Sequence, residues 1–149
     1  MAIDFESLKR DVIDKYGTRN GPNCSECMFS YAMRLMPDDI PPELIRIATP
    51  FGGGLARNED TCGALIASLM VIGLKYGRSD FEDDKKRAYD IASDFYKWFK
   101  SEFGSTNCFE LNHGDYTSKE HCERCGGKFV TESIRHLDKI FDKIDSGEE

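Results

Sequence analysis

The sequence has no apolar run long enough to cross a lipid bilayer. Its longest apolar stretch, from Ala64 to Leu74, falls well short of the roughly 20 residues that a transmembrane helix needs. It also has no excess of basic residues, because its formal net charge is −7 and its lysines and arginines form no cluster. Nucleic acids bind basic surfaces. We therefore expect neither a membrane nor a nucleic acid among the partners of this protein.

The first residues, MAIDFESLKRD, lack the features of a secretory signal. Such a signal has a basic head followed by an unbroken apolar segment, whereas here charged residues are interspersed among the apolar ones. We therefore expect a cytoplasmic location. This expectation bears on the cysteines, because the reducing cytosol disfavours structural disulfides.

No segment alternates apolar and polar residues in the manner of a half-buried strand. No internal repeat, low-complexity tract or linker divides the 149 residues. Hydrophobic residues make up 40% of the chain and charged residues 32%, which is ordinary for a globular protein. Together these features predict an all-α fold in a single domain over residues 1–149.

Apolar residues recur at helical spacing through most of the chain. The pattern predicts a bundle of about five to six helices around a central helix at about residues 61–76, which is apolar on almost every side. The other helices are expected at 5–16 with a stop at Gly17, at 23–36 with Asn23 as N-cap, at 42–48, at 81–103 and at 128–144. The stretch between the last two helices is expected to be a polar loop.

Cysteine is plentiful in this chain. The six cysteines are Cys24, Cys27, Cys62, Cys108, Cys122 and Cys125, and four of them form two C-x-x-C pairs. In a reducing compartment such a set indicates metal binding or redox chemistry rather than a disulfide framework. The alternative is that free cysteines serve as small buried hydrophobic residues, which suits a lone cysteine better than six.

Three of the cysteines fall in the first turns of predicted helices. Cys24 and Cys27 open the helix at 23–36, and Cys62 opens the central helix. A helix N-terminus carries a partial positive charge and free N–H groups, which stabilise a thiolate. These three residues are therefore our candidate catalytic thiols.

Three glycines, Gly52, Gly53 and Gly54, lie in the segment FGGGLARNEDTCGA before the central helix. Glycine permits close approach of the backbone to another element or to a bound group, so this loop is a candidate cofactor-binding loop. The alternative is a flexible loop of good turn residues. A phosphate loop is excluded, because the Gly-Lys-Ser/Thr ending is missing. Asp60 and Thr61 are candidate caps for the helix that follows.

Metal binding competes with thiol chemistry as an interpretation of the cysteines. The candidate ligands are Cys24, Cys62, Cys108, Cys122 and Cys125, and four thiolates suit either zinc or an iron–sulfur cluster. The two C-x-x-C pairs lie much further apart than the roughly 15–20 residues of a zinc ribbon, and no ferredoxin spacing occurs. Haem c is excluded, because no histidine follows either pair.

The three histidines give little guidance. His121 adjoins Cys122 and could act on its pKa or serve as a ligand, but we expect its side chain in solvent. His113 is expected to be exposed, and His136 to lie at the boundary of the last helix. The sequence shows no cysteine–histidine pair of the kind that cysteine proteases need.

These motifs together resemble a bacterial and archaeal redox-active protein family named for its pattern C_GCAxxG_C_C. The resemblance covers most of the chain: NCSEC is similar to its first cysteine motif, FGGGLARNEDTCGALIASLMVIGLKYG to its central signature, and Cys108 with FEL to its third cysteine. Cys122 or Cys125 supplies the fourth. The chain departs from the pattern in having Ala67 where the family has glycine and an extra cysteine near each end.

The resemblance implies an all-helical fold and a redox role without naming a substrate. It also leaves an iron–sulfur cluster open as a cofactor, because related domains occur in cytochromes that contain haem and such a cluster. We expect Cys24, Cys62, Cys108 and either Cys125 or Cys122 to converge around the glycine loop, with Cys27 beside Cys24. Cys62 is the expected attacking thiol and Cys24 the expected resolving thiol of a thiol-dependent oxidoreductase. Its partner would be a redox protein or a small thiol, and its large apolar faces are compatible with a homodimer.

Overall fold

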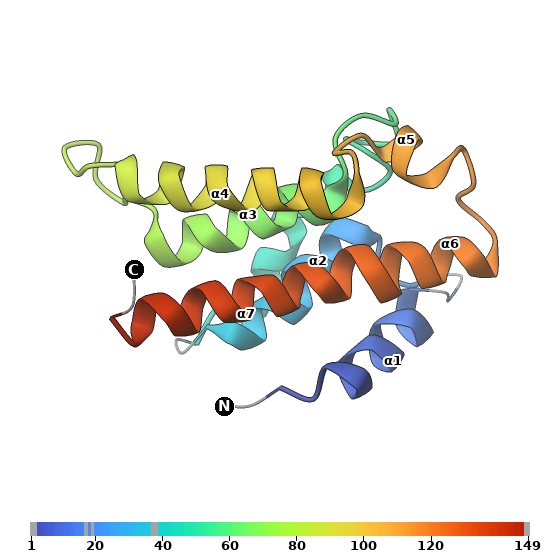
Figure 1. The fold of residues 1–149 in the computed structure, drawn as a ribbon, viewed down its shortest axis with the longest axis horizontal. Coiled ribbons are helices and arrows are strands. Elements are labelled where there is room, and N and C mark those ends of the chain that lie inside the picture. The colour runs from blue at the N-terminus through green and yellow to red at the C-terminus, as the bar shows by residue number, and fades with distance from the viewer. Residues whose placement is uncertain (1–2, 17, 19, 37–38, 148–149) are drawn as a thin grey trace.

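The structure is a computed structural model of the chain and describes residues 3–16, 18, 20–36 and 39–147. Within these ranges all regular structure is helical, apart from one isolated β-bridge (Figure 1). The α-helices are α1 (Phe5–Tyr16), α2 (Cys24–Ala32), α3 (Gly63–Tyr76), α4 (Lys86–Phe103), α5 (Cys108–Asn112), α6 (Lys119–Arg124) and α7 (Thr131–Asp145). Three 3-10 segments, η1 (Met33–Leu35), η2 (Pro42–Ile47) and η3 (Thr49–Phe51), and one π-helical segment, η4 (Cys125–Val130), complete the described chain. The predicted all-α class is confirmed.

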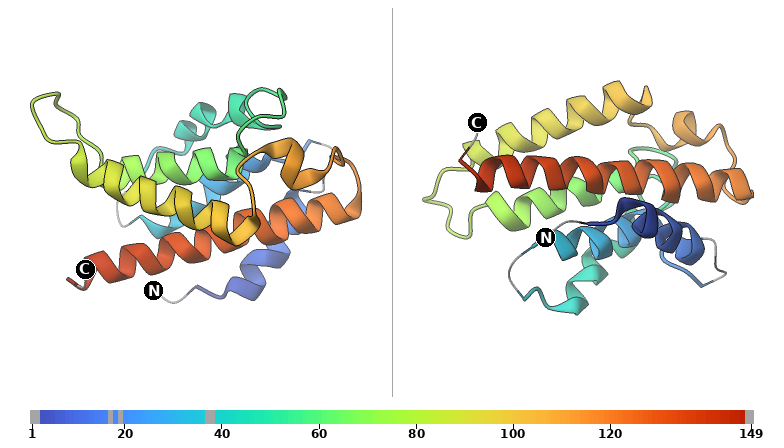
Figure 2. Two further views of the ribbon diagram at one scale, coloured as in Figure 1. Left: turned by 45° about the horizontal axis from the view of Figure 1, so that its top comes forward. Right: turned by 60° about the horizontal axis from the view of Figure 1, so that its bottom comes forward.

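The helices are arranged around α3. This helix packs against α2, α4 and α7, while α1 packs against η4 and α7. In Figures 1 and 2, α6, η4 and α7 run on as one long rod that lies alongside the α3–α4 pair. The glycine loop, α5 and the start of α2 gather at one end of this arrangement (Figure 1).

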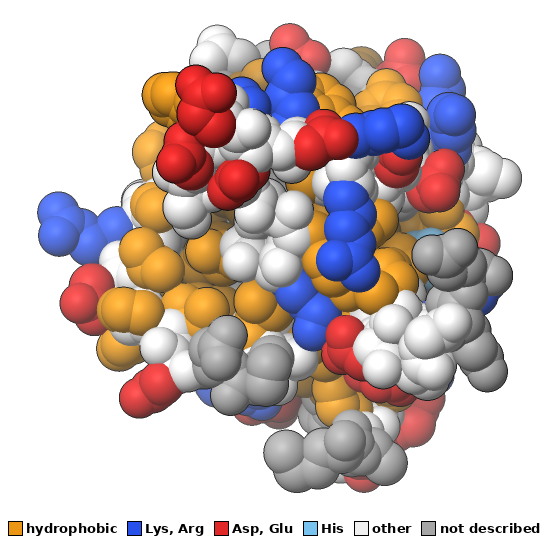
Figure 3. All heavy atoms as spheres, turned by 90° about the vertical axis from the view of Figure 1, so that its left-hand side faces the viewer, with side chains coloured by type: hydrophobic (Ala, Val, Ile, Leu, Met, Phe, Trp, Pro, Cys, Tyr) orange, Lys and Arg blue, Asp and Glu red, His pale blue; other side chains and the backbone are white. Residues whose placement is uncertain are grey.

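The core is built from the predicted apolar faces. Its largest fully buried side chains include Phe29 of α2, Leu65 of α3, Phe95 and Phe99 of α4, and Ile134 of α7. Burial of each side chain of this size contributes roughly 1.5–3 kcal/mol to folding. No helix in the described ranges is both long enough and apolar enough to pass through a membrane. At the end of the molecule away from the glycine loop, hydrophobic side chains reach the surface between charged ones (Figure 3).

Several predicted helix boundaries need correction. The central helix begins at Gly63 rather than 61, because Thr61 is extended and forms the β-bridge with Asn107. Cys62 is therefore the N-cap, a role that we had expected of Asp60 or Thr61. The helix predicted from 23 to 36 tightens into 3-10 geometry after Ala32, and the one predicted at 42–48 is 3-10 throughout. The expected stop of the first helix at Gly17 lies outside the described residues.

The helix predicted at 81–103 begins only at Lys86. Two aspartates explain the delay: the Asp80 side chain accepts the N–H of Glu82, and the Asp84 side chain accepts the N–H of Lys86. Aspartates that bond to nearby backbone in this way compete with helix formation.

The largest difference concerns the second C-x-x-C pair, which we expected in a loop. The chain is helical from Lys119 onward, because the Ser118 hydroxyl caps this helix by accepting the N–H of His121 at 3.0 Å. Gly126 and Gly127 form a pair of the kind that usually interrupts a helix. Here they lie within the π-helical segment, which packs against α1. A Cβ on Gly127 would lie 2.9 Å from Cδ1 of Ile13, so glycine here lets α1 come close.

Candidate functional site

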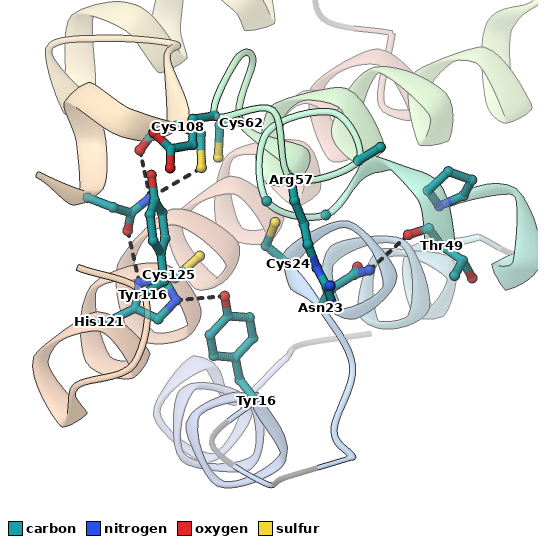
Figure 4. A pocket seen from close by; sticks show the side chains of 16 residues that line it. Tyr16, Asn23, Cys24, Thr49, Arg57, Cys62, Cys108, Tyr116, His121 and Cys125 are labelled. Atoms are coloured by element: carbon teal, nitrogen blue, oxygen red, sulfur yellow. Dashed lines mark hydrogen bonds between the residues drawn. The ribbon is translucent and has the colours of Figure 1, made fainter. Parts of the chain in front are cut away.

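Four cysteines line one pocket of about 660 Å³ (Figure 4). They are Cys24 at the start of α2, Cys62 before α3, Cys108 at the start of α5, and Cys125 in η4. Each is at most 5% exposed, so their sulfurs can be reached only through the pocket. Residues from four separate parts of the chain are thus brought to a single cavity.

The remaining two cysteines lie outside this pocket. Cys27, which we expected beside Cys24 as a candidate catalytic thiol, is fully buried in the hydrophobic core. Cys122, one of the candidate metal ligands, is half-buried and does not line the cavity. Of the last C-x-x-C pair it is therefore Cys125 that joins the other pocket cysteines.

A capping box fixes the start of α2. The Asn23 side chain accepts the N–H of Glu26 at 2.9 Å, and the Glu26 carboxylate accepts the N–H of Asn23 at 3.0 Å, which confirms Asn23 as the N-cap. The Asn23 amide also donates to the carbonyl of Thr49 at 2.9 Å, and the Ser25 hydroxyl donates to the carbonyl of Ala48 at 2.6 Å. These bonds hold Cys24, the first residue of α2, against the loop that covers it.

The isolated β-bridge places Cys62 beside Cys108. The N–H of Cys62 donates to the carbonyl of Thr106 at 2.8 Å, and the N–H of Cys108 donates to the carbonyl of Asp60. One backbone hydrogen bond on each side of the bridge therefore holds these two cysteines together, and Figure 4 shows them side by side.

At three positions, Gly52, Gly54 and Gly63, the backbone comes so close to pocket residues that only glycine fits. A Cβ on Gly52 would lie 2.6 Å from Cγ of Asn23, and one on Gly63 would lie 2.6 Å from the sulfur of Cys24. A Cβ on Gly54 would lie 2.5 Å from Cβ of Cys108. Real Cβ atoms do not come so near to other atoms, so any larger residue would displace the cysteines or their supports.

The glycine loop continues in a run of left-handed backbone from Gly53 to Arg57. The φ angles of Leu55, Ala56 and Arg57 are 65°, 53° and 65°, although none of them is glycine. A left-handed conformation costs such residues roughly 1–2 kcal/mol each. Backbone bonds that close across the loop, such as Arg57 N–H to the carbonyl of Gly52 at 3.0 Å, hold it in place. Strain of this kind is characteristic of functional sites.

Hydrogen bonds lower the pKa of Cys24 to about 7. The largest contribution comes from the thiol of Cys125, which donates to the Cys24 sulfur, and the N–H groups of Gly53, Gly63 and Ser25 add to it. Burial opposes these bonds but is outweighed. The pocket therefore stabilises a thiolate at Cys24.

The other thiols of the pocket, and that of Cys27 in the core, are held in the protonated form. Burial raises the pKa of Cys62 and of Cys108, and the nearby Cys24 raises both further. The hydrogen bond that Cys125 donates to Cys24, together with burial, raises the pKa of Cys125. Burial raises the pKa of Cys27 to about 12. A single thiolate surrounded by neutral thiols is the resulting charge state near pH 7.

A chain of polar side chains connects two walls of the pocket. The Tyr16 hydroxyl lies 3.0 Å from Nε2 of His121, and Nδ1 of His121 lies 3.0 Å from Oδ1 of Asn112. The Asn112 amide donates to the carbonyl of Cys108 at 2.9 Å and to its sulfur at 3.6 Å. This orientation of the amide makes Nδ1 of His121 the donor and leaves Nε2 to accept from Tyr16. Tyr16 also adjoins Cys125, so this set of polar groups extends from Cys125 to Cys108.

The position of His121 corrects our expectation of a solvent-exposed side chain. It is only 5% exposed, because the helical turn capped by Ser118 directs the imidazole under Tyr16. Burial lowers its pKa, which favours the neutral ring. His113 is exposed and His136 is half-buried, as expected, and His136 stacks on Trp98 with ring centroids 3.9 Å apart.

The other side chains of this hydrogen-bonded row, Tyr16, Asn112 and Arg124, could not be found from the sequence. Arg124 donates to Oδ1 of Asn112 at 3.3 Å and to the backbone carbonyls of Asn112 and Asp115 at 3.3 and 3.2 Å, so it fixes the amide. Tyr16 comes from α1, and no spacing relates it to His121. The one local signal was the proximity of His121 to the second C-x-x-C pair.

Four of the five candidate metal ligands, all but Cys122, line the pocket. Among the described residues, no three histidine, cysteine, aspartate or glutamate side chains lie in an arrangement that could hold one metal ion. The pocket cysteines as they lie do not fit such an ion.

The described chain is thus an all-helical protein with a pocket lined by four cysteines. The chain belongs to the family described as "Putative redox-active protein (C_GCAxxG_C_C)", whose model matches residues 22–140. The family resemblance noted in the sequence is confirmed, and with it the description of the protein as redox-active. No curated protein and no solved structure shows significant similarity to the chain.

Proposed function

We propose that this protein is a thiol–disulfide oxidoreductase in which Cys24 is the attacking thiol and Cys125 the resolving thiol. The observation that carries the proposal is the environment of the Cys24 sulfur, which accepts hydrogen bonds from Cys125 and from three backbone N–H groups. A thiolate is the nucleophile of thiol chemistry, and an attacking thiol works best when its pKa is near the ambient pH. Cys24, with a pKa of about 7, meets this condition.

The reaction proceeds in two displacements. The Cys24 thiolate attacks one sulfur of a substrate disulfide, a bond forms between the two sulfurs, and the other substrate sulfur leaves as a thiolate that takes a proton from water. Cys125 then loses its proton and attacks the Cys24 sulfur, which forms the Cys24–Cys125 disulfide and releases the second substrate thiol. Two electrons and two protons pass to the substrate, and a reduced cellular thiol restores the dithiol by the reverse steps.

This assignment exchanges the roles that we expected of Cys24 and Cys62. Cys62 lines the pocket, but burial raises the pKa of its thiol, whereas the pKa of Cys24 is lowered. Cys62 and Cys108 lie side by side in the same pocket and are suited to accept the disulfide from the first pair. Cys27 has no direct part in this scheme, because it does not reach the pocket.

Tyr16 and His121 support the second displacement. Cys125 must give up its proton before it attacks. Once Cys24 is bonded to the substrate sulfur, the Cys125 thiol can donate to the oxygen of the adjoining Tyr16, whose own hydroxyl proton is directed toward Nε2 of His121. A neutral imidazole can accept a proton that arrives through the tyrosine hydroxyl. In this role Tyr16 positions the resolving thiol and His121 takes its proton.

Binding of zinc or of an iron–sulfur cluster by the same cysteines is the second candidate function. It is favoured by the gathering of Cys24, Cys62, Cys108 and Cys125 around one cavity, since four thiolates are the usual ligand set. The side chains would have to rearrange to hold a single ion. Elemental analysis and the visible absorption spectrum of anaerobically purified protein separate this function from thiol exchange.

The proposed function is tested with the reduced protein and a small disulfide in single-turnover experiments. We expect one small thiol to be released quickly and a second to follow, with loss of two protein thiols. Cys24→Ser should abolish both phases, whereas Cys122→Ser, at a cysteine outside the pocket, should leave both intact. Release of thiol by the Cys24→Ser variant at the original rate would overturn the proposal.

A further inference from the structure

We propose that the pocket selects small disulfides that carry a carboxylate, and that Arg57 binds this carboxylate at the mouth of the pocket. The inference rests on the proposed function and adds a substrate class to it. Three features support it: the depth of the thiols, the placement of Arg57, and the separation of charge at the pocket mouth.

The depth of the thiols favours a small substrate over a protein disulfide. All four pocket cysteines are at most 5% exposed. A disulfide on the surface of a folded protein cannot reach sulfurs at this depth, whereas a cavity of about 660 Å³ falls within the usual range of small-molecule sites. The substrate disulfide must therefore enter the pocket itself.

Arg57 occupies a backbone position that glycine would fill at lower cost. Its φ angle is 65°, at the end of the left-handed run that begins at Gly53. The side chain lines the pocket and, in Figure 4, runs past Cys24 toward Asn23. An arginine kept in a strained conformation indicates that the side chain has a use there.

The guanidinium of Arg57 is available to a ligand. The side chain is exposed, and among the described residues no carboxylate forms an ion pair with it. It is also the one arginine or lysine among the described residues that line the pocket. A guanidinium presents two parallel N–H groups that match the two oxygens of a carboxylate.

Charge at the pocket mouth is separated in a way that orients such a ligand. Glu59 lines the same pocket, on the side of Cys108 and Tyr116. Burial raises the pKa of the Cys108 thiol and of the Tyr116 hydroxyl, and the negative charge of Glu59 raises both pKa values further. A substrate carboxylate is therefore repelled from the Cys108 side and attracted to Arg57, which places the adjoining disulfide over Cys24.

Three small disulfides of similar size test the inference: 3,3′-dithiodipropionate with carboxylates, 2-hydroxyethyl disulfide without charge, and cystamine with ammonium groups. We measure the second-order rate constant for formation of the mixed disulfide at Cys24 by rapid quenching and mass spectrometry. We expect the carboxylate disulfide to react about tenfold faster than the neutral one and cystamine to react most slowly, with smaller differences at high salt. Reduction of a protein disulfide such as that of insulin should be far slower.

Two variants assign the selectivity to Arg57. Arg57→Gln should slow the carboxylate disulfide about tenfold and the neutral disulfide less than twofold, while Glu59→Gln, the matched change of the opposite charge, should keep the preference for carboxylate. Arg57→Gly removes the charge and also relieves the backbone strain, so it should fold at least as well as the native protein and still lose the preference. This variant separates loss of binding from loss of folding.

The outcomes distinguish the two proposals. If the neutral disulfide fails to react with the native protein, the proposed thiol exchange is wrong. If the neutral disulfide reacts but the carboxylate disulfide is not preferred, or the preference survives Arg57→Gln, thiol exchange stands and the substrate class is wrong. Rapid reduction of insulin would likewise contradict a small-molecule pocket.

Discussion

The thiol of Cys125, in the π-helical segment η4, donates a hydrogen bond to the sulfur of Cys24, the first residue of α2. These residues meet because glycines line the approach on both sides. Gly126 and Gly127 let α1 close on η4, and Gly63 lets the backbone before α3 come within contact of Cys24. One member of the pair is thereby prepared as a thiolate and the other as its proton-bearing neighbour.

The pH dependence of alkylation tests the state of Cys24. A free cysteine has a pKa of about 8.5, whereas the hydrogen bonds lower that of Cys24 to about 7. Because the folded value is the lower one, the thiolate persists between about pH 7 and 8.5 and is lost as pH falls through 7. We expect the rate of iodoacetamide modification at Cys24, followed by peptide mass spectrometry, to rise with a midpoint near pH 7. A midpoint above 8.5 would show that the thiolate is not stabilised.

Substitution of Cys125 separates the two displacements. Cys125→Ala removes the hydrogen-bond donor to Cys24 and the thiol that resolves the mixed disulfide. We expect the reaction to stop after one small thiol is released, with the other still bound to Cys24, and the pKa of Cys24 to rise. Intact-mass measurement detects the adduct. Cys122→Ala, in the same C-x-x-C pair but outside the pocket, should complete the reaction.

Removal of one hydroxyl tests the polar chain. Tyr16→Phe deletes the group that contacts both Nε2 of His121 and Cys125. The second phase of thiol release should slow, while the first phase should be retained. Leaving the imidazole without its partner should also lower the free energy of unfolding by about 1–3 kcal/mol.

A second tyrosine provides the control for this change. Tyr31→Phe also removes a tyrosine hydroxyl bonded to a side chain, in that case the carboxylate of Asp11, which lies outside the cysteine pocket. It should leave both phases of thiol release unchanged. Equal kinetics in the two variants would exclude Tyr16 from the reaction.

Two glycines of α3 make a matched pair. Gly63→Ala would bring a Cβ to 2.6 Å from the Cys24 sulfur, whereas a Cβ at Gly73 meets nothing within 4 Å. We expect Gly63→Ala to destabilise the protein by roughly 1–3 kcal/mol and to slow attack by Cys24. Gly73→Ala should stabilise the helix by about 0.5–1 kcal/mol without an effect on the reaction. Chemical denaturation and single-turnover kinetics measure the two effects, and similar results for both variants would contradict the close approach at Gly63.

The fold could be predicted where apolar periodicity is strong. The inward faces of α1, α3, α4 and α7 follow from it, because burial of one stripe of side chains is what holds these helices in place. Helix starts were less predictable, since Asp80 and Asp84 satisfy local N–H groups outside a helix and Ser118 caps one that we had not expected. Pairs of glycines usually interrupt helices, and η4 is an exception because α1 packs against its glycines.

The site could be predicted only in part. Position at a predicted helix start indicated Cys24 and Cys62 correctly but also Cys27, which lies outside the pocket, whereas Cys108 was indicated only by the family resemblance. The glycine loop indicated a close approach of backbone, which the structure contains. The choice between Cys122 and Cys125 depends on how the π-helical segment is oriented toward the pocket, which no spacing reveals. Tyr16 and Arg57 reach the pocket through tertiary packing and left-handed backbone respectively, so neither could be found from local pattern.

The most direct test of the account is the map of the disulfide that forms when the reduced protein is oxidised with one equivalent of a small disulfide. Tryptic peptides analysed by mass spectrometry without reduction identify the joined cysteines. The account predicts that Cys24 and Cys125 are joined first. An initial disulfide that includes Cys27 or Cys122, or a protein whose pocket thiols stay reduced, would contradict it.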